Sequence, residues 1–508
     1  MKRHFDVIVL GRSIGALTAA AVLARRDFTT LVLGNGSPSP AYSALDLPLE
    51  RRPPMLLGAT SPCWLRVLSE LAQTQTWRRR LVPAEPALQA LAPGFRVDLS
   101  NDAGHFAREI DREFPELYHV VEQLYRRLDA VDQAADEAFD KDAIWPPGTF
   151  WERRETGKHA ARLPYVHAEP DADLLSEFPR GHFYRRLVRA SVLFGTNFST
   201  LPPPFAIARL HGAWRRSSAR LAEGDAELER FLVERIESHG GQCRLGDRAA
   251  AIHLRRGVAA GVVLENDDQP TGCEFVLTDL DGESVAQLAG GQGIHKSALR
   301  EWPRITSTVA RFVVSLVART EGLPEPLARS SILFVDPASH PRGYPQAIHL
   351  TRTPRPGGLT TLSAEIMWPD HGSLELAEAR RFVLAALLRE LPFLSRHLLV
   401  VDSPFDGLPV WEMRDGVARE RPRRSLGLSP IEPMVRQVEV DPPGYLGFSG
   451  EPVRGPIERT LLLGRSVLPG LGQEGELLAA WSAARLVTKS DRRKAMMRRD
   501  TWTKMEIG

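Results

Sequence analysis

The stretch from residue 4 to residue 37, HFDVIVLGRSIGALTAAAVLARRDFTTLVLGNGS, constrains the fold more than any other part of the chain. Val7–Leu10 is a fully apolar run that ends at Gly11, which is typical of a buried parallel strand. The next residues, IGALTAAAVLARR, place Ala and Leu at helical spacing and two arginines at the far end, where they favour the helix dipole. Thr29–Gly34 is a second run of β-branched and apolar residues. Strand, glycine turn, helix and strand within about thirty residues predict a βαβ unit.

Such a unit is the start of a Rossmann-type fold, in which the N–H groups at the helix N-terminus bind a pyrophosphate. The G-x-G-x-x-G pattern aligns as Gly11, Ser13 and Ala16, with an additional Gly15. Gly11 keeps the tight turn, and Ala16 is tolerated because its position only governs how closely helix and strand pack. Ser13 adds a Cβ where a bare glycine lets the backbone approach the pyrophosphate, although its hydroxyl can donate to a phosphate oxygen.

The residue at the end of the second strand is also unusual. In a Rossmann-type fold, an acidic side chain at this position binds the ribose of the dinucleotide, but this chain has Gly34 there. The missing charged hydrogen bond weakens cofactor binding by about 1.5–3 kcal/mol. Asn35 beside it can replace part of that contact. The candidate cofactor-binding residues of this unit are Gly11, Arg12, Ser13, Ile14, Gly15, Ala16 and Asn35.

The stretch TLLLGRSVLPGLGQEGELLAAWSAARLV, residues 460–487, has a strand, a turn rich in Gly and Pro, and an Ala-rich helix. It resembles the C-terminal flavin motif of the phytoene desaturase family, a branch of the amine-oxidase-like FAD-dependent oxidoreductases. The matching residues are Gly464, Ser466, Pro469, Gly470, Gly472 and Gly475; the departures are Arg465, Leu468, Leu471 and Glu474. The resemblance implies FAD as cofactor, with Gly464, Arg465, Ser466, Pro469, Gly470 and Gly472 at its site. It also implies hydride removal from an apolar, isoprenoid-like substrate, for which no catalytic residue stands out.

The resemblance extends loosely over the rest of the chain and predicts an α/β protein. A discontinuous FAD/NAD(P)-binding domain comprises residues 1–100, 205–290 and 445–490. A helical insert occupies 101–204, and a mixed antiparallel sheet forms a substrate domain over 291–444. The runs TVARFVVSLVA, SSILFVD, QAIHLTRT and TTLSAEIMW are expected strands of that sheet, followed by a helix over Leu374–Leu394.

Other features weaken the flavin site and leave two hypotheses open. The Gly-Gly-Arg segment that follows the second strand in this family is missing, and Arg51 and Arg52 are the nearest basic residues. Arg12 and Arg465 stand where the family has small residues. They either clamp the phosphates as charged donors, or they fill an emptied cleft or pair with carboxylates such as Glu474. The chain is accordingly either a flavin-dependent desaturase or oxidase, or a flavin-free pseudoenzyme that keeps the fold as a binding or scaffold protein.

Composition excludes several other classes of protein. The 508 residues carry a net charge of +2, which gives no argument for nucleic acid as a partner. Three cysteines without a C-x-x-C pair favour a reducing cytoplasm, and no metal-binding motif is present. No apolar run suits a signal peptide or a membrane span. The segment after residue 487 has seven basic and three acidic residues, so its end, 491–508, is a candidate contact with a membrane surface or a protein.

Overall fold

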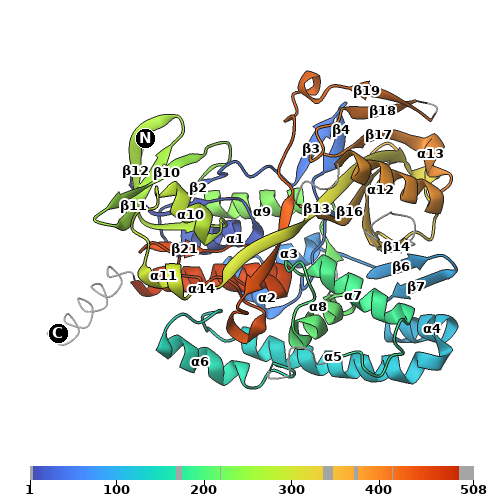
Figure 1. Ribbon diagram of the computed structural model, residues 1–508, viewed down its shortest axis with the longest axis horizontal. Coiled ribbons are helices and arrows are strands. Elements are labelled where there is room, and N and C mark those ends of the chain that lie inside the picture. The colour runs from blue at the N-terminus through green and yellow to red at the C-terminus, as the bar shows by residue number, and fades with distance from the viewer. Residues whose placement is uncertain are drawn as a thin grey trace.

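The computed structural model describes residues 4–166, 174–217, 219–335, 347–370, 376–414 and 416–490 (Figure 1). The basic C-terminal segment 491–508 lies outside these residues. A sheet built around the N-terminal strand occupies the left of the view, a larger sheet occupies the right, and a layer of helices runs along the bottom. Among the described residues, no helix has the length and apolar character that crossing a membrane requires.

The first sheet draws its strands from distant parts of the chain. Its parallel core has the order β21-β12-β1-β2-β9, and two antiparallel strands, β10 and β11, extend it along the first half of β12. The bounds are β1 (His4–Leu10), β2 (Thr30–Leu33), β9 (Gln242–Arg244), β10 (Ala249–Arg255), β11 (Val258–Leu264), β12 (Asp267–Thr278) and β21 (Thr460–Leu462). The predicted βαβ unit is therefore present, and strands from near both ends of the chain flank β12.

Three helices pack together beside this sheet: α1 (Ile14–Arg25), α9 (Asp225–Ser238) and α14 (Gly472–Ser490). Helix α1 contacts both of the others, and every residue from Ile14 to Ala24 is buried. The alanines of α1 follow from this position, because small side chains allow helices and sheet to approach closely on several sides. The same burial explains why α1 has almost no polar face.

The second sheet is mixed and centres on β13 (Arg304–Arg319), in the order β19-β18-β17-β13-β16-β15-β14-β6-β7, with β20 paired to the first half of β13. The other bounds are β6 (Leu88–Ala92), β7 (Phe95–Leu99), β14 (Ser330–Phe334), β15 (Ala347–Arg355), β16 (Leu359–Pro369), β17 (Leu398–Asp402), β18 (Val410–Arg414), β19 (Val417–Arg421) and β20 (Val435–Asp441). Helix α12 (Leu376–Glu390) packs Ala379, Val383 and Leu387 against it. The four predicted strands are confirmed; the predicted helix Leu374–Leu394 is confirmed over α12, which ends at Glu390, while residues 374 and 375 lie outside the described residues.

One predicted boundary falls in the wrong place. Residues 88–99, which were expected in the nucleotide-binding domain, form β6 and β7, and β6 pairs in parallel with β14 of the second sheet. The hairpin itself is a local feature of the sequence, whereas its partner strand lies more than two hundred residues away along the chain. Nothing in the local pattern identifies that partner.

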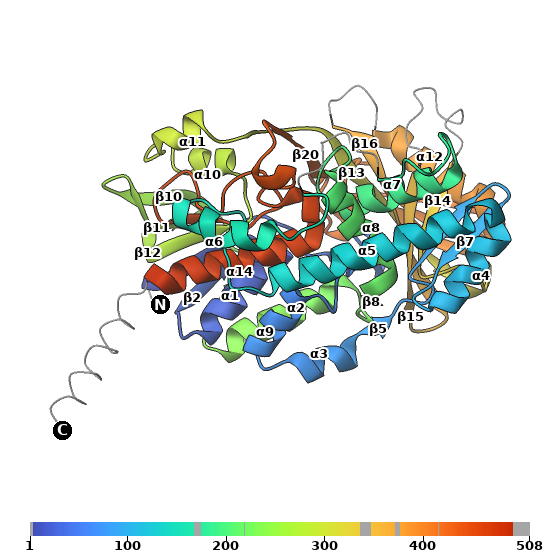
Figure 2. The same cartoon turned by 90° about the horizontal axis from the view of Figure 1, so that it is seen from below.

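The insert contributes the helical layer seen from below in Figure 2. Its helices are α4 (Ala103–Glu113), α5 (Tyr118–Phe139), α6 (Phe150–Ala160) and α7 (Phe183–Gly195), and α8 (Pro204–Ser217) continues the layer. Smaller elements include β4 (Leu47–Glu50), α2 (Pro62–Glu70), α10 (Gly282–Leu288) and α11 (Lys296–Arg300). Helices α5 and α6 lie beside α14 in Figure 2, so the insert covers one side of the first sheet.

Candidate functional site

The two glycine turns meet at a single residue, Asp279. Gly11 follows β1, Gly464 follows β21, and Asp279 follows β12, which lies between those strands. A Cβ on Gly11, whose φ is +116°, would lie 1.9 Å from the Asp279 carboxylate, and one on Gly464 would lie 2.2 Å from the Asp279 carbonyl oxygen. Neither position can therefore hold a side chain, because Asp279 lies too close to both glycines.

Carboxylates of the protein itself satisfy the N-terminus of α1. The Ser13 N–H donates to Asp279 Oδ2 at 2.9 Å, and the Ser13 hydroxyl accepts from the Ala16 N–H at 3.2 Å. Burial raises the pKa of Asp279, although hydrogen bonds from Ser13 and Arg12 favour its ionised form. Burial also raises the pKa of Glu476 on α14, and the Gly15 N–H opposes that shift. The acceptors at the first turn of α1 are thus carboxylates of the chain itself.

The side of the site where a ribose would lie is closed by α9 and β9. Arg12 donates two hydrogen bonds to Glu229 of α9, at 2.7 and 2.5 Å. A Cβ on Gly34 would lie 1.9 Å from the carbonyl oxygen of Leu245, directly after β9. The side-chain oxygen of Asn35 accepts from the Ala249 N–H at 3.2 Å. Asn35, expected to replace part of the ribose contact, and Arg12, a candidate phosphate clamp, are therefore both engaged within the protein.

Arg465 lies between the two sheets and faces Glu476 at 3.6 Å. Burial lowers the pKa of Arg465, Glu476 opposes this shift, and Arg52 and Arg311 lower the pKa further. The cavity that these groups line, together with Ile14, has a volume of about 50 Å³. Cavities that bind drug-sized ligands have volumes of roughly 300–1,000 Å³. Arg465 and its neighbours therefore leave space for a few water molecules only.

The C-terminal turn packs against the end of the insert. A Cβ on Gly470 would lie 2.6 Å from Phe448, and one on Gly472, whose φ is +54°, would lie 2.0 Å from the carbonyl oxygen of Gly195. The Pro469 carbonyl oxygen accepts from the Thr196 hydroxyl at 3.0 Å and from the Asn197 N–H at 2.9 Å. Ser466 is buried in the same turn. Contacts within the protein therefore account for the glycines that match the family motif.

The carboxylates at this site are the functional residues that sequence reasoning missed. Asp279 lies in the stretch CEFVLTDLD, directly after the end of β12. Its position directly after a strand was the available signal, since a carboxylate there faces the glycine turn of a neighbouring parallel strand. Asp225 accepts from Arg52 at 2.5 Å, and Glu432 pairs with Arg51 at 2.6 Å. Each of these carboxylates lies far from its arginine in the sequence, so no spacing of residues along the chain could have predicted the pair.

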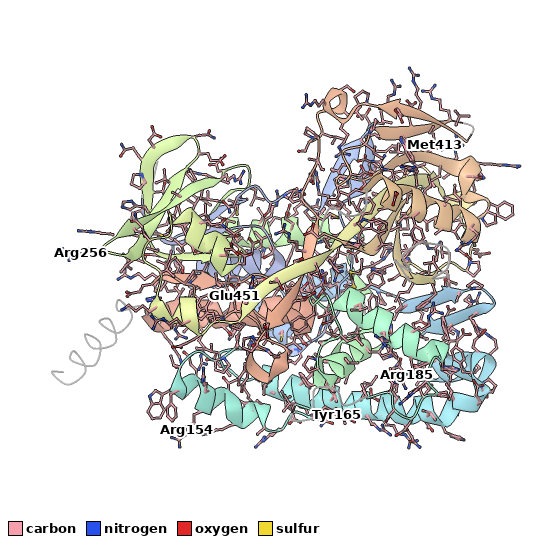
Figure 3. The ribbon with its side chains drawn as sticks, viewed as in Figure 1. Arg154, Tyr165, Arg185, Arg256, Met413 and Glu451 are labelled. Carbon is pink, nitrogen blue, oxygen red and sulfur yellow. The ribbon has the colours of Figure 1, made fainter. Side chains whose placement is uncertain are left out.

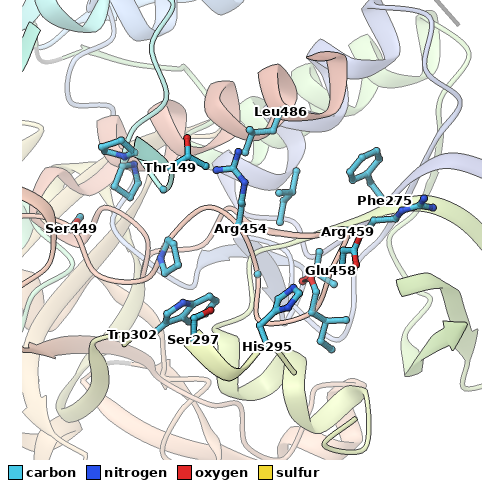
Figure 4. A pocket seen from close by; sticks show the side chains of 18 of the residues that line it. Thr149, Phe275, His295, Ser297, Trp302, Ser449, Arg454, Glu458, Arg459 and Leu486 are labelled. Atoms are coloured by element: carbon cyan, nitrogen blue, oxygen red, sulfur yellow. Dashed lines mark hydrogen bonds between the residues drawn. The ribbon is translucent and has the colours of Figure 1, made fainter. Parts of the chain in front are cut away.

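A much larger cleft, of about 1,490 Å³, lies at the opposite edge of the first sheet (Figure 4). It is lined by the starts of β1 and β21, by Glu274 and Phe275 of β12, by α11 and the residues after it, and by the last turns of α14. Trp302, His295 and Arg454 contribute side chains to the cleft, and several prolines border it. Cofactors of open α/β sheets bind at the carboxyl ends of the strands, so this cleft is distinct from the predicted flavin site.

No family model and no curated protein sequence matches this chain. Solved structures do match it over nearly its full length. An oxidoreductase from Methanosarcina mazei is 13% identical, with 94% of this chain and 100% of that chain covered and a TM-score of 0.57. Cyclohexylamine oxidase from Brevibacterium oxydans is 14% identical (96% and 99% covered, TM-score 0.54), and putrescine oxidase is 13% identical (96% and 99% covered, TM-score 0.51). The fold is that of the amine-oxidase-like FAD-dependent oxidoreductases, as predicted.

The residues at the glycine turns do not fit the cofactor of that fold. A pyrophosphate at the α1 N-terminus would lie against the Asp279 carboxylate, which already accepts the Ser13 N–H. Two anions at one helix N-terminus repel each other, and the low dielectric of a buried site strengthens the repulsion. The ribose side is closed by Leu245, and the cavity beside Arg465 is far smaller than a flavin.

Proposed function

We propose that this chain is a flavin-free binding protein that retains the fold of FAD-dependent oxidoreductases without their redox chemistry. The observation that carries the proposal is the hydrogen bond from the Ser13 N–H to Asp279, by which a carboxylate of the protein takes the place of the pyrophosphate. Fold does not fix function, because an α/β core can serve as a platform for other sites.

The charged groups around this position support the same conclusion. Arg12 pairs with Glu229, Arg52 pairs with Asp225, and Arg465 faces Glu476. Each cation that could bind a phosphate has a carboxylate of the chain as its partner. A bound dinucleotide would have to break these half-buried pairs and leave their carboxylates without a cation.

The competing hypothesis is a desaturase that removes hydride from an isoprenoid-like substrate, as the resemblance to phytoene desaturases implies. That chemistry belongs to the flavin, with the protein orienting the substrate against the ring. The small cavity beside Arg465 favours the flavin-free alternative. In a binding protein, the cleft at the opposite edge of the sheet is the place that a ligand would occupy, since its volume of about 1,490 Å³ is ample.

Flavin titration tests the proposal directly. The purified chain should be colourless, with no absorbance near about 450 nm, and should release no flavin on denaturation. Added FAD should keep its free fluorescence up to roughly 100 μM, which corresponds to a binding free energy weaker than about −5.5 kcal/mol. Copurified flavin, or saturable binding at micromolar concentration, would show that the ion pairs open and that the chain is a flavoprotein.

A further inference from the structure

The outer face of α6 bears two large aromatic side chains that the fold does not cover. Phe150 is 72% exposed and Trp151 is 70% exposed, and their rings contact each other edge to face with centroids 5.5 Å apart. Large aromatic residues usually bury most of their surface, and an exposed apolar pair marks an interaction site more often than a single exposed residue does.

Helix geometry places basic residues on the same face as the aromatic pair. At 3.6 residues per turn, Phe150, Trp151, Arg154 and Lys158 lie within about 100° of each other around the α6 axis. All four are exposed, whereas Glu152, Thr156 and Ala160 on the opposite side are buried. Figure 3 shows Arg154 on the outer side of α6, at the lower left edge of the molecule.

The acidic residues of α6 do not neutralise this face. Glu152 accepts from Arg454 at 2.6 Å and caps the helix N-terminus, and Glu155 accepts from Arg485 of α14 at 3.1 Å. Arg154 and Lys158 have no ion pair with any residue that the structure describes. The outer face is therefore aromatic and cationic, because contacts to other elements engage both carboxylates.

We propose that the outer face of α6 is a docking surface for a membrane that contains anionic phospholipid. Tryptophan and phenylalanine rings insert at the level of lipid headgroups, and flanking Arg and Lys side chains pair with the phosphates. A projecting aromatic pair suits a deformable interface, whereas a folded partner would need a preformed pocket for it. The inference concerns a surface far from the glycine turns and does not depend on whether flavin binds.

The position of α14 strengthens the choice of a lipid surface as the partner. The Glu155–Arg485 pair joins α6 to α14, and the two helices lie side by side in Figure 2. Helix α14 ends at Ser490, and the next eighteen residues of the sequence, 491–508, contain six basic and three acidic residues. The chain therefore leaves α14 beside α6 with further basic residues, each of which raises the partition onto an anionic surface by about fivefold.

Vesicle cosedimentation of the full chain tests the proposal, with phosphatidylcholine vesicles compared with vesicles containing about one third phosphatidylserine. The wild type should bind the anionic vesicles and should lose most binding when salt rises from 0.1 to 0.5 M (concentrations approximate), since salt screens surface charges. The double variant Phe150→Ser/Trp151→Ser should bind at least tenfold more weakly. Arg154→Gln/Lys158→Gln should bind at least tenfold more weakly and with less salt dependence.

Phe393→Ser is the matched control, because Phe393 is also 70% exposed but lies beside the second sheet, after α12. This variant should bind the vesicles as the wild type does. All the substituted side chains are exposed, so unchanged thermal midpoints will confirm folding. Wild-type affinity in the aromatic variant would overturn the proposal. The proposal would also be overturned if vesicle binding were lost only when residues 491–508 are deleted. A chain that captured an acidic protein but bound no vesicles would overturn it as well.

Discussion

Gly34→Glu is the substitution that sequence reasoning selects to restore a ribose contact, and the structure predicts that it destabilises the protein. A Cβ at position 34 would lie 1.9 Å from the carbonyl oxygen of Leu245, 2.7 Å from its carbonyl carbon and 3.1 Å from its Cα. All three atoms belong to the backbone, so no side-chain rotation relieves the overlap. The segment that contains Leu245 must retreat by about 1 Å before even the smallest side chain fits.

The size of the expected loss of stability follows from the backbone hydrogen bonds between this segment and the residues directly after β2. The Gly34 N–H donates to the Arg244 carbonyl oxygen at 3.3 Å, and the Asn35 N–H donates to that of Asp247 at 3.0 Å. Overpacking of this kind costs about 1–3 kcal/mol, and weakening two such hydrogen bonds adds about 0.5–1.5 kcal/mol each. The expected loss is therefore about 2–6 kcal/mol for Gly34→Glu, and Gly34→Ala should show most of it because it introduces the same Cβ.

Denaturant unfolding followed by tryptophan fluorescence measures this loss as a shift of the midpoint, since a chain of several units need not unfold in one step. Gly246→Ala is the control, because it changes the same connection and a Cβ at Gly246 meets no atom within 4 Å. The control should unfold with the wild-type midpoint. A wild-type midpoint for Gly34→Glu, or a gain of FAD binding, would show that the segment after β9 does not close the site.

Three further outcomes are expected. Ser13→Ala should lower stability by about 0.5–2 kcal/mol because it removes the cap of α1, whereas Ser13→Gly should cost only a few tenths; thermal midpoints of the two variants test the difference. Arg465→Ala should cost about 1–3 kcal/mol in denaturant unfolding, because Glu476 loses the cation that faces it, and should leave flavin titration unchanged. Burial raises the pKa of Glu152, but hydrogen bonds from Arg454 and from the backbone outweigh this and lower it to about 2. The contribution of ionised Glu152 to the stability of the folded protein is thus complete above 4.5, the pKa of this group in the unfolded chain, and is lost as the pH falls from 4.5 towards 2. Acid unfolding should show the wild type losing its advantage over Arg454→Gln in that window.

The sequence by itself determined the elements and the class of fold. Val7–Leu10, the turn at Gly11 and the Ala-rich helix after it could form only a buried strand, a tight connection and a buried helix, because periodicity and glycine conformation are local properties. The glycines after Leu463 identified the second turn in the same way. The resemblance to the phytoene desaturase family, and not local periodicity, predicted that segments from near both ends of the chain join one domain; β1 and β21 both pair with β12.

Only the tertiary structure decided what the glycine turns contact. Asp279 faces both turns, and Glu229 and Glu476 lie beside Arg12 and Arg465. The sequence left two alternatives for those arginines because the direction of a side chain depends on its neighbours in space and not on its spacing along the chain. A glycine fits equally well beneath a phosphate or beneath a carboxylate, since either needs only the absence of a Cβ. The identity of the anion at this helix N-terminus is therefore a property of the folded protein, in which the end of β12 lies between two strands that are hundreds of residues apart.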